Sequence, residues 1–188
     1  MDIGLLGRAA AMFAVTNVDD LVLLAVFFGQ TPAGRRGELK VVGGQFLGFA
    51  AILAVSVAGA LGAGLLPDGA VRWLGVLPVL LGIRAAWQAR HQDADEPPTA
   101  TGLLGIATVC FANGGDNVGV YVPAFAATGP AGLVSYVVVF LAGVAVWCVA
   151  GRFLATRPAV GRVLAKWGHI VLPAVLIALG VLILLGAF

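Results

Sequence analysis

A run of 35 residues, from Asn117 to Gly151, contains no Asp, Glu, Lys or Arg. No helix in the core of a soluble domain needs such a length, whereas a pair of membrane-crossing helices needs about 20 apolar residues for each crossing. The rest of the chain agrees, because 61% of its residues are hydrophobic and 11% are charged, against about 25% charged residues in soluble domains. The sequence therefore predicts an all-α integral membrane protein and excludes a water-soluble globule.

Charged residues and clusters of Pro and Gly divide the chain into six apolar segments, each long enough to span about 30 Å of hydrocarbon. The third segment is interrupted by Arg72 and Arg84, whose long side chains can reach the two membrane interfaces. The predicted transmembrane helices are residues 4–28, 41–65, 70–89, 101–126, 131–154 and 168–187.

Basic residues are distributed unevenly over the loops between these spans. Loops rich in Lys and Arg face the cytoplasm, so both termini are expected outside. Two basic residues, Arg8 and Arg72, fall on the outer side. The net charge of +2 gives no reason to expect a nucleic-acid partner. The predicted cytoplasmic loops contain Arg35, Arg36, Lys40, Arg84, Arg90, Arg152, Arg157, Arg162 and Lys166.

Three short sequence matches indicate an internal duplication. They pair NVDD with NGGD, FL with FL and LP with LP, in the same order, at residues 17–20 and 113–116, 46–47 and 140–141, and 77–78 and 172–173. Because each unit contains an odd number of spans, the second unit enters the membrane from the opposite side and forms an inverted repeat. We expect a first three-helix repeat at residues 1–90, a cytoplasmic linker at 91–100 and a second three-helix repeat at 101–188.

Three acidic residues, Asp19, Asp20 and Asp116, lie in the middle of spans one and four. An ionised Asp at the centre of a bilayer costs about 2.5 to 3.5 kcal/mol, so three together need compensation. No Lys, Arg or His is predicted at the same depth. The sequence therefore predicts that an external cation, or protons, neutralises these carboxylates at a site near the middle of the membrane.

Side chains that carry oxygen surround these carboxylates at helical spacing. An interval of three residues puts Asn17 beside Asp20 and Asn113 beside Asp116, on one face of each helix. Two such faces, one from each repeat, would direct carboxylate and amide oxygens toward one point. The predicted ligands of the cation are Thr16, Asn17, Asp19, Asp20, Asn113, Asp116 and Asn117.

Two glycines interrupt the second acidic motif. Gly114 and Gly115 weaken the helix, because each costs about 1 kcal/mol relative to Ala, and an unwound turn would offer backbone carbonyl oxygens as further ligands. Other polar or sulfur-containing residues within the spans suit packing roles instead. These are Gln45, Thr108, Tyr121, Cys110 and Cys148.

Four segments carry a resemblance to a known family: TNVDDLVLLAVFF at 16–28, GQFLGF at 44–49, VLPVLLGI at 76–83 and ANGGDNVGVYVP at 112–123. The chain resembles the cadmium-resistance transporter (CadD-type) family of the LysE exporter superfamily, six-span bacterial proteins associated with efflux of divalent heavy-metal cations. The resemblance implies a bacterial inner-membrane protein in which Asp19, Asp20, Asp116 and Asn117 handle the cation. An oxygen-rich shell suits Mn²⁺ or Mg²⁺ at least as well as Cd²⁺ or Zn²⁺, so the metal stays open.

The predicted function is secondary export of divalent cations by alternating access, in exchange for protons and without a resident cofactor. Asp20 and Asp116 would form the symmetric ligand pair, because two carboxylates neutralise a divalent cation, and Asp19 would be the proton-linked group. A thiol redox enzyme is disfavoured, because Cys110 and Cys148 both belong to the second half. An exporter of amino acids or other small organic solutes and a non-transporting structural subunit remain alternatives, and the chain can pair as a homodimer.

Overall fold

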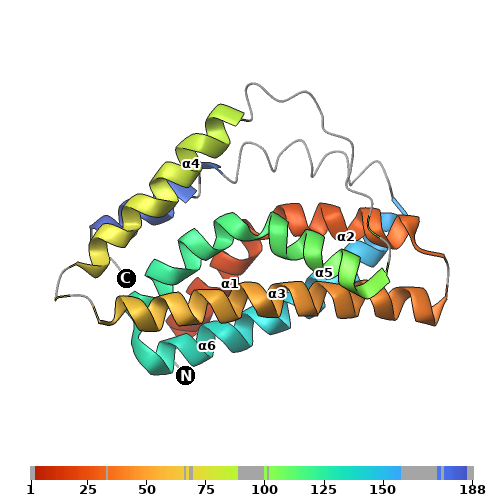
Figure 1. Ribbon diagram of the computed structural model, residues 1–188, viewed down its shortest axis with the longest axis horizontal. Coiled ribbons are helices and arrows are strands. Elements are labelled where there is room, and N and C mark those ends of the chain that lie inside the picture. The colour runs from red at the N-terminus through yellow and green to blue at the C-terminus, as the bar shows by residue number, and fades with distance from the viewer. Residues whose placement is uncertain are drawn as a thin grey trace.

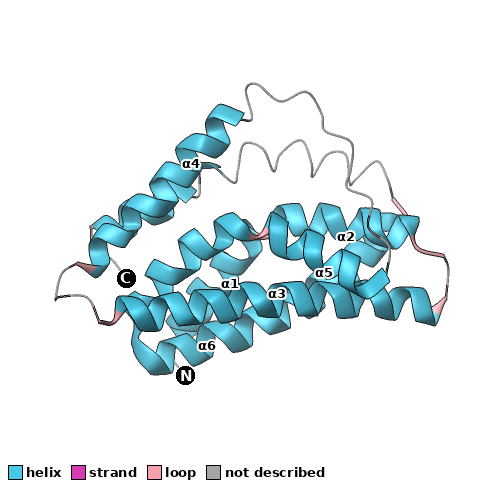
Figure 2. Cartoon of the chain, viewed as in Figure 1, coloured by secondary structure: helices cyan, strands magenta, loops and turns pink. Residues whose placement is uncertain are grey.

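The computed structural model describes residues 3–32, 34–65, 67, 70–88, 100, 102–157, 173–174 and 176–185. Most of the predicted linker at 91–100, and the first part of the sixth predicted span, lie outside the described residues. Every regular element in the described part of the chain is helical, as expected for an all-α protein (Figure 2).

The helices follow the order of the predicted spans (Figure 1). A bent pair stands in place of the first span, a single long helix in place of the second, and a short 3₁₀ turn leads into the third. The elements are α1 (Ile3–Thr16), α2 (Val18–Gln30), α3 (Arg35–Ala63), η1 (Val71–Gly75), α4 (Val76–Gln88), α5 (Gly102–Asn113) and α6 (Gly115–Ala155), with a further helical stretch at 176–184.

Within the described residues, two helices are long and apolar enough to cross a membrane by themselves, namely Arg35–Ala63 and Ala131–Ala155. The bent pair of α1 and α2 makes a third crossing if it is counted as one span. These helices are those of a membrane protein, and the full set of six spans stays a prediction. Helix α3 begins six residues before the predicted second span, so that Arg35, Arg36 and Lys40 lie on its first turns.

The first predicted span is broken at Asn17, where α1 and α2 meet at a bend of 57°. The Asn17 backbone leaves the helical region at φ −119° and ψ 25°. The carbonyl oxygen of Phe13 accepts from the Asn17 side-chain Nδ2 at 2.8 Å and from the Asn17 backbone N–H at 3.1 Å, so the side chain adds a hydrogen bond at the bend. The sequence did not indicate this break.

The fourth predicted span is broken at Gly114, between α5 and α6. This is the interruption that the two glycines predict. A Cβ atom at Gly114 would collide with the side chain of Ile52 on α3, so the position accepts only glycine without a shift of its neighbour. The breaks at Asn17 and Gly114 lie in the two matching motifs.

Helix α6 joins the end of the fourth predicted span to the fifth. Its path changes at Gly129, which has a φ of 68° and a ψ of 176°. Glycine adopts this conformation without the steric cost that a side chain would bring. The change falls in the interval between the predicted limits at residues 126 and 131, and the part of the helix that follows, Ala131–Ala155, is long and apolar enough to cross a membrane.

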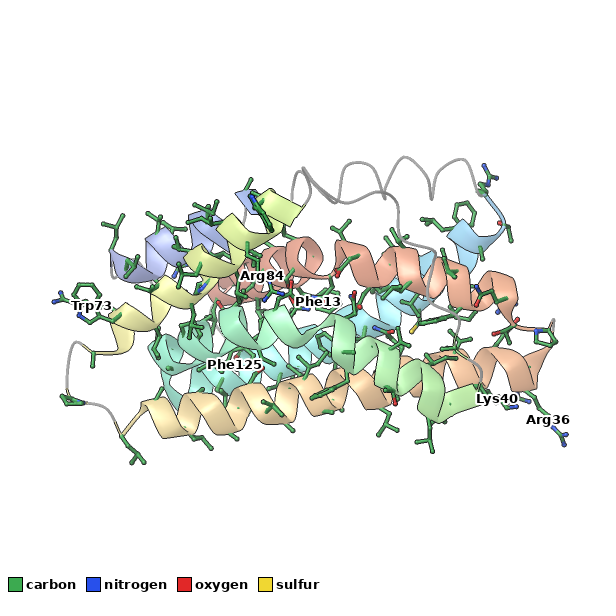
Figure 3. The ribbon with its side chains drawn as sticks, turned by 45° about the horizontal axis from the view of Figure 1, so that its top comes forward. Phe13, Arg36, Lys40, Trp73, Arg84 and Phe125 are labelled. Atoms are coloured by element: carbon green, nitrogen blue, oxygen red, sulfur yellow. The ribbon has the colours of Figure 1, made fainter. Side chains whose placement is uncertain are left out.

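Aromatic side chains fill the space between α1, α3 and α6. Phe49, Tyr121 and Phe140 are fully buried, and the Tyr121 and Phe140 rings meet edge to face with their centroids 4.8 Å apart. Phe13 and Phe125 extend the cluster on two sides (Figure 3). This rigid apolar layer lies directly beside the polar groups at the two breaks, since Tyr121 belongs to both.

A second group of helices, α4 and residues 176–184, lies against one side of this bundle (Figure 1). They approach closely at glycines, because a Cβ atom added to Gly75, the last residue of η1 directly before α4, would come within 2.6 Å of the Gly180 carbonyl oxygen. Gly82 is packed in the same way against Ile177. Small residues allow helices to pack closely in membranes, and here they join the third predicted span to the sixth.

Candidate cation site

Two adjacent carboxylates begin helix α2. Asp19 and Asp20 occupy its first turn, directly after the break at Asn17. The amide of Asn113, the last residue of α5, reaches both: its Nδ2 donates to Asp19 Oδ2 at 2.7 Å and to Asp20 Oδ1 at 3.3 Å. One amide therefore joins the two repeat-related motifs. Asn113 is 94 residues from Asp19 and 93 residues from Asp20 in the chain.

A third element contributes to this cluster. Gln45 of α3 donates from Nε2 to Asp20 Oδ2 at 2.9 Å. Both side chains are 2% exposed, so the Asp20 carboxylate receives one amide hydrogen bond on each oxygen in a site shielded from solvent. Charged groups in such surroundings require paired hydrogen bonds. A packing role was expected for Gln45 from the sequence, whereas in the structure its amide contacts the Asp20 carboxylate.

A buried network of neutral polar groups lies next to the carboxylates. The Tyr121 hydroxyl is 2.9 Å from Thr16 Oγ1 and accepts from Asn17 Nδ2 at 2.8 Å. Asn117 Nδ2 donates to Asn17 Oδ1 at 3.4 Å, and the Trp147 indole donates to the Asn17 carbonyl oxygen. Three side chains of α6 thus hold the break at Asn17. Neither Tyr121 nor Trp147 was predicted to take part.

Asp116 is the least enclosed member of the predicted set. Its Oδ1 accepts from the backbone N–H of Asn117 at 3.0 Å. Asp116 belongs to the same repeat motif as Asn113, three residues further along the chain. The closest hydrogen-bonded unit is nevertheless that of Asp19, Asp20 and Asn113, rather than the symmetric pair of Asp20 and Asp116 that the sequence predicts.

Two oxygen atoms at the site, Asp19 Oδ1 and Asn117 Oδ1, are buried and have no hydrogen-bond partner among the residues that the structure describes. An unpaired buried acceptor costs about 1 to 3 kcal/mol, and oxygen atoms of this kind are ligands for hard and borderline divalent cations. Among the described residues, no group of three or more His, Cys, Asp or Glu side chains is arranged to hold a metal ion. A ligand set here must therefore include the amide oxygens.

The two cysteines lie beside the site without entering it. Cys110 is fully buried, and its Sγ is directed to the backbone carbonyl oxygen of Gln45 at 3.8 Å. Cys148 is also buried and free. Both therefore have the packing role that the sequence predicts, and the groups that face the carboxylates are oxygen and nitrogen atoms.

This arrangement defines a class: a helical membrane protein whose buried polar groups gather at breaks in its helices, as they do in secondary transporters. The family model described as cadmium resistance transporter matches residues 13–187, and the chain belongs to that family. The matched range includes all seven predicted ligand residues and confirms the resemblance seen in the sequence. No curated protein and no solved structure matches the chain. Membership of this family indicates metal-ion export.

Proposed function

We propose that the chain exports divalent metal cations by alternating access of the site around Asp19, Asp20 and Asn113, in exchange for protons. The observation that carries the proposal is the double hydrogen bond from the Asn113 amide to the two carboxylates. It brings paired anionic oxygens, which suit a divalent cation, to the point where two broken helices meet. The amide hydrogens occupy the place where a cation would neutralise those oxygens.

The amide groups suit both an empty and a loaded site. A side-chain amide carries two N–H donors and one carbonyl acceptor on opposite sides of its last torsion. Asn113 and Gln45 donate to the carboxylates in this structure, and a half-turn of either group would present its oxygen to a bound cation instead. The unpaired Oδ1 atoms of Asp19 and Asn117 supply two further ligands.

The charge balance supports coupling to protons. Two carboxylates neutralise a divalent cation, and the third carboxylate leaves an excess negative charge unless it binds a proton. When the cation leaves, mutual repulsion and the low local dielectric favour protonation of the empty site. Asp19 is our choice for the proton-linked group, because one of its oxygens has no hydrogen-bond partner.

The matching positions of the two breaks support alternating access. Inverted repeats with broken helices commonly place a binding site near the middle of the membrane and expose it to each side in turn by movement of one half against the other. Here the breaks at Asn17 and Gly114 meet at the carboxylates. We propose that the basic loops are cytoplasmic, that both termini lie outside, and that the cell is bacterial with the chain in its inner membrane.

Uptake by proteoliposomes tests this function. The lumen is made acidic and contains a metal-sensitive dye, and Mn²⁺ or Cd²⁺ is added outside with the wild type, Asp20→Asn, or the control Asp93→Asn, whose carboxylate lies outside the predicted spans. We expect the proton gradient to drive metal uptake by the wild type and the control. Asp20→Asn should lower the initial rate about tenfold or more, the scale seen when metal sites lose supporting groups.

Two results would contradict separate parts of the proposal. Metal uptake that is the same with and without the proton gradient removes the exchange mechanism. An unchanged rate in Asp20→Asn, with equal protein incorporation, removes the assignment of the site. Repeating the assay with Mg²⁺ and Zn²⁺ ranks the four candidate metals.

A further inference from the structure

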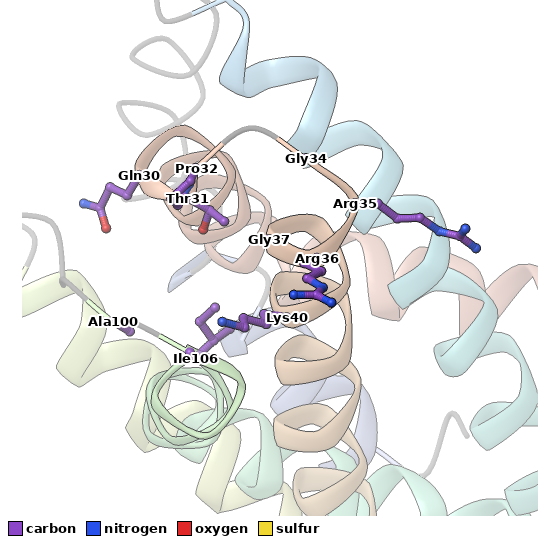
Figure 4. A pocket seen from close by; sticks show the side chains of 11 residues that line it. Gln30, Thr31, Pro32, Gly34, Arg35, Arg36, Gly37, Lys40, Ala100 and Ile106 are labelled. Carbon is purple, nitrogen blue, oxygen red and sulfur yellow. The ribbon is translucent and has the colours of Figure 1, made fainter.

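A second polar site lies at the opposite end of α2 from the carboxylates. The end of α2, the start of α3 and the start of α5 surround a cavity of about 600 Å³. In Figure 4, Lys40 extends from α3 toward Ile106 of α5, with Arg36 one turn before it, whereas Arg35 points to the other side of the helix. The cavity is comparable in size to the pockets that hold small ligands in proteins, roughly 300 to 1,000 Å³.

The positive charge of this cavity is not balanced within the described part of the chain. Arg36 and Lys40 are exposed and form no ion pair with a described residue. Glu38 shares their turn of helix, but its carboxylate pairs with Arg152 of α6 at 2.7 Å. The acidic group nearest in sequence is therefore already paired with another cation, and within the described residues no acidic group forms an ion pair with Arg36 or Lys40.

The start of α3 adds to this charge. Helix α3 contains 29 residues, and its N-terminus, with Gly34 as the N-cap residue, has no side-chain capping hydrogen bond. The N-terminal end of a helix carries a partial positive charge and favours anions. Gly37 lets the preceding loop pack directly on this turn, because a Cβ atom there would come within 2.6 Å of the Pro32 carbonyl oxygen.

We propose that this cavity binds a phosphate group, supplied by the headgroup of an anionic phospholipid or by a soluble phosphate. Arg36 and Lys40 lie four residues apart on one face of α3, and guanidinium and ammonium groups are the side chains that bind phosphate. The walls formed by Pro32 and Ile106 suit the apolar part of a lipid. Basic pockets between membrane helices bind anionic headgroups by the same chemistry.

Binding measurements on the full-length protein in detergent test the site. The probes are short-chain phosphatidylglycerol, short-chain phosphatidylcholine and inorganic phosphate, each titrated separately. The site variant is Arg36→Gln/Lys40→Gln. The matched control is Arg72→Gln/Arg157→Gln, which removes the same charge from exposed positions outside the cavity.

We expect the wild type and the control to bind phosphatidylglycerol or inorganic phosphate, and the site variant to lose about thirtyfold in affinity, since each basic group at a lipid surface contributes about fivefold. Preference for phosphatidylglycerol over both other probes assigns the site to a lipid, and preference for inorganic phosphate assigns it to a soluble anion. Metal transport is not part of the readout, so the result is independent of the proposed function.

Three results would overturn the proposal. The first is an equal loss of binding in the site variant and the control, which indicates general attraction between opposite charges. The second is absence of binding by the wild type to all three probes. The third is phosphate binding that appears only in a variant in which Asp93, Asp95 and Glu96 are replaced by Asn, Asn and Gln. Arg36 and Lys40 would then pair with acidic groups of the chain itself in the wild type.

Discussion

At the scale of single residues, the central finding is that the buried carboxylates are held by amides. Asp20 receives hydrogen bonds from Gln45 and Asn113, and Asp19 receives one from Asn113. An amide compensates part of a negative charge without supplying a full positive charge, so the carboxylates keep an attraction for a cation. A Lys or Arg in either position would neutralise the site permanently.

Loss of the Gln45 amide is expected to weaken cation binding. Gln45→Leu keeps the size of the side chain but leaves Asp20 Oδ2 without its donor and the bound cation without an amide oxygen. We expect the dissociation constant of Mn²⁺ or Cd²⁺, measured by calorimetric titration, to rise about 10- to 100-fold. Gln30→Leu, at an exposed position, is the control. Equal affinities in the two variants would exclude Gln45 from the site.

Two buried tyrosines allow the network around the break to be tested without the metal. The Tyr121 hydroxyl contacts Thr16 and Asn17, whereas the Tyr136 hydroxyl is buried without a hydrogen-bond partner among the described residues. Tyr121→Phe should lower the free energy of unfolding by about 1 to 3 kcal/mol, because it leaves buried polar groups unpaired.

Tyr136→Phe should leave the unfolding free energy unchanged or raise it, since it removes a polar group that has no partner. Unfolding in mixed micelles, followed by circular dichroism, compares the two variants. A larger loss in Tyr136→Phe than in Tyr121→Phe would contradict the hydrogen-bond network described for Asn17.

At the scale of secondary structure, the breaks in the two motif-bearing helices determine which side chains can meet. The glycines predicted the break at Gly114. The break at Asn17 could not be predicted, because a lone Asn in an apolar helix can also face a neighbour or bond to its own backbone. Its partners Tyr121 and Trp147 are 104 and 130 residues away in the chain, and no spacing pattern in the sequence predicts contacts at such separations.

Adjacent glycines at the second break have opposite surroundings. A Cβ atom at Gly114 would collide with Ile52, whereas Gly115 has open space around it. Gly114→Ala should lower the free energy of unfolding by about 1 to 3 kcal/mol through overpacking, and Gly115→Ala should raise it by about 0.5 to 1 kcal/mol through helix propensity. Thermal unfolding of both variants checks the difference.

The double variant Gly114→Ala/Ile52→Ala provides the control for this clash. Shortening Ile52 makes room for the added methyl group, so the two changes should cost less together than the sum of their separate costs. Strict additivity would show that the loss in Gly114→Ala comes from the backbone rather than from contact with α3.

At the scale of the whole molecule, charge and hydrophobicity predict the order of the segments well. The positive φ of Gly129 lies where a glycine separates two predicted spans, whereas α3 extends over the charged residues Arg35, Arg36 and Lys40 that were expected to precede it. Which side chains contact one another between helices depends instead on how the helices pack. Gln45 and Ser56 are both buried polar residues of α3, and only the approach of α2 gives Gln45 a carboxylate to bond.

The predicted orientation can be tested with thiol labelling, because both native cysteines are buried and should give little background. Arg35→Cys and Leu65→Cys place exposed thiols near the two ends of α3. A membrane-impermeant maleimide added to intact cells with a permeable outer membrane should label Leu65→Cys alone. In inverted inner-membrane vesicles it should label Arg35→Cys alone. The reverse pattern would invert the topology.

The Trp147 indole donates a hydrogen bond to the carbonyl oxygen of Asn17, so the intrinsic fluorescence of Trp147 depends on the structure of the protein at this break. Trp147 is one of four tryptophans, and its indole contacts the bend between α1 and α2 directly. Any rearrangement that straightens or widens that bend must change the polarity felt by this ring. The wavelength of its emission therefore records the motion of the transporter without an attached dye.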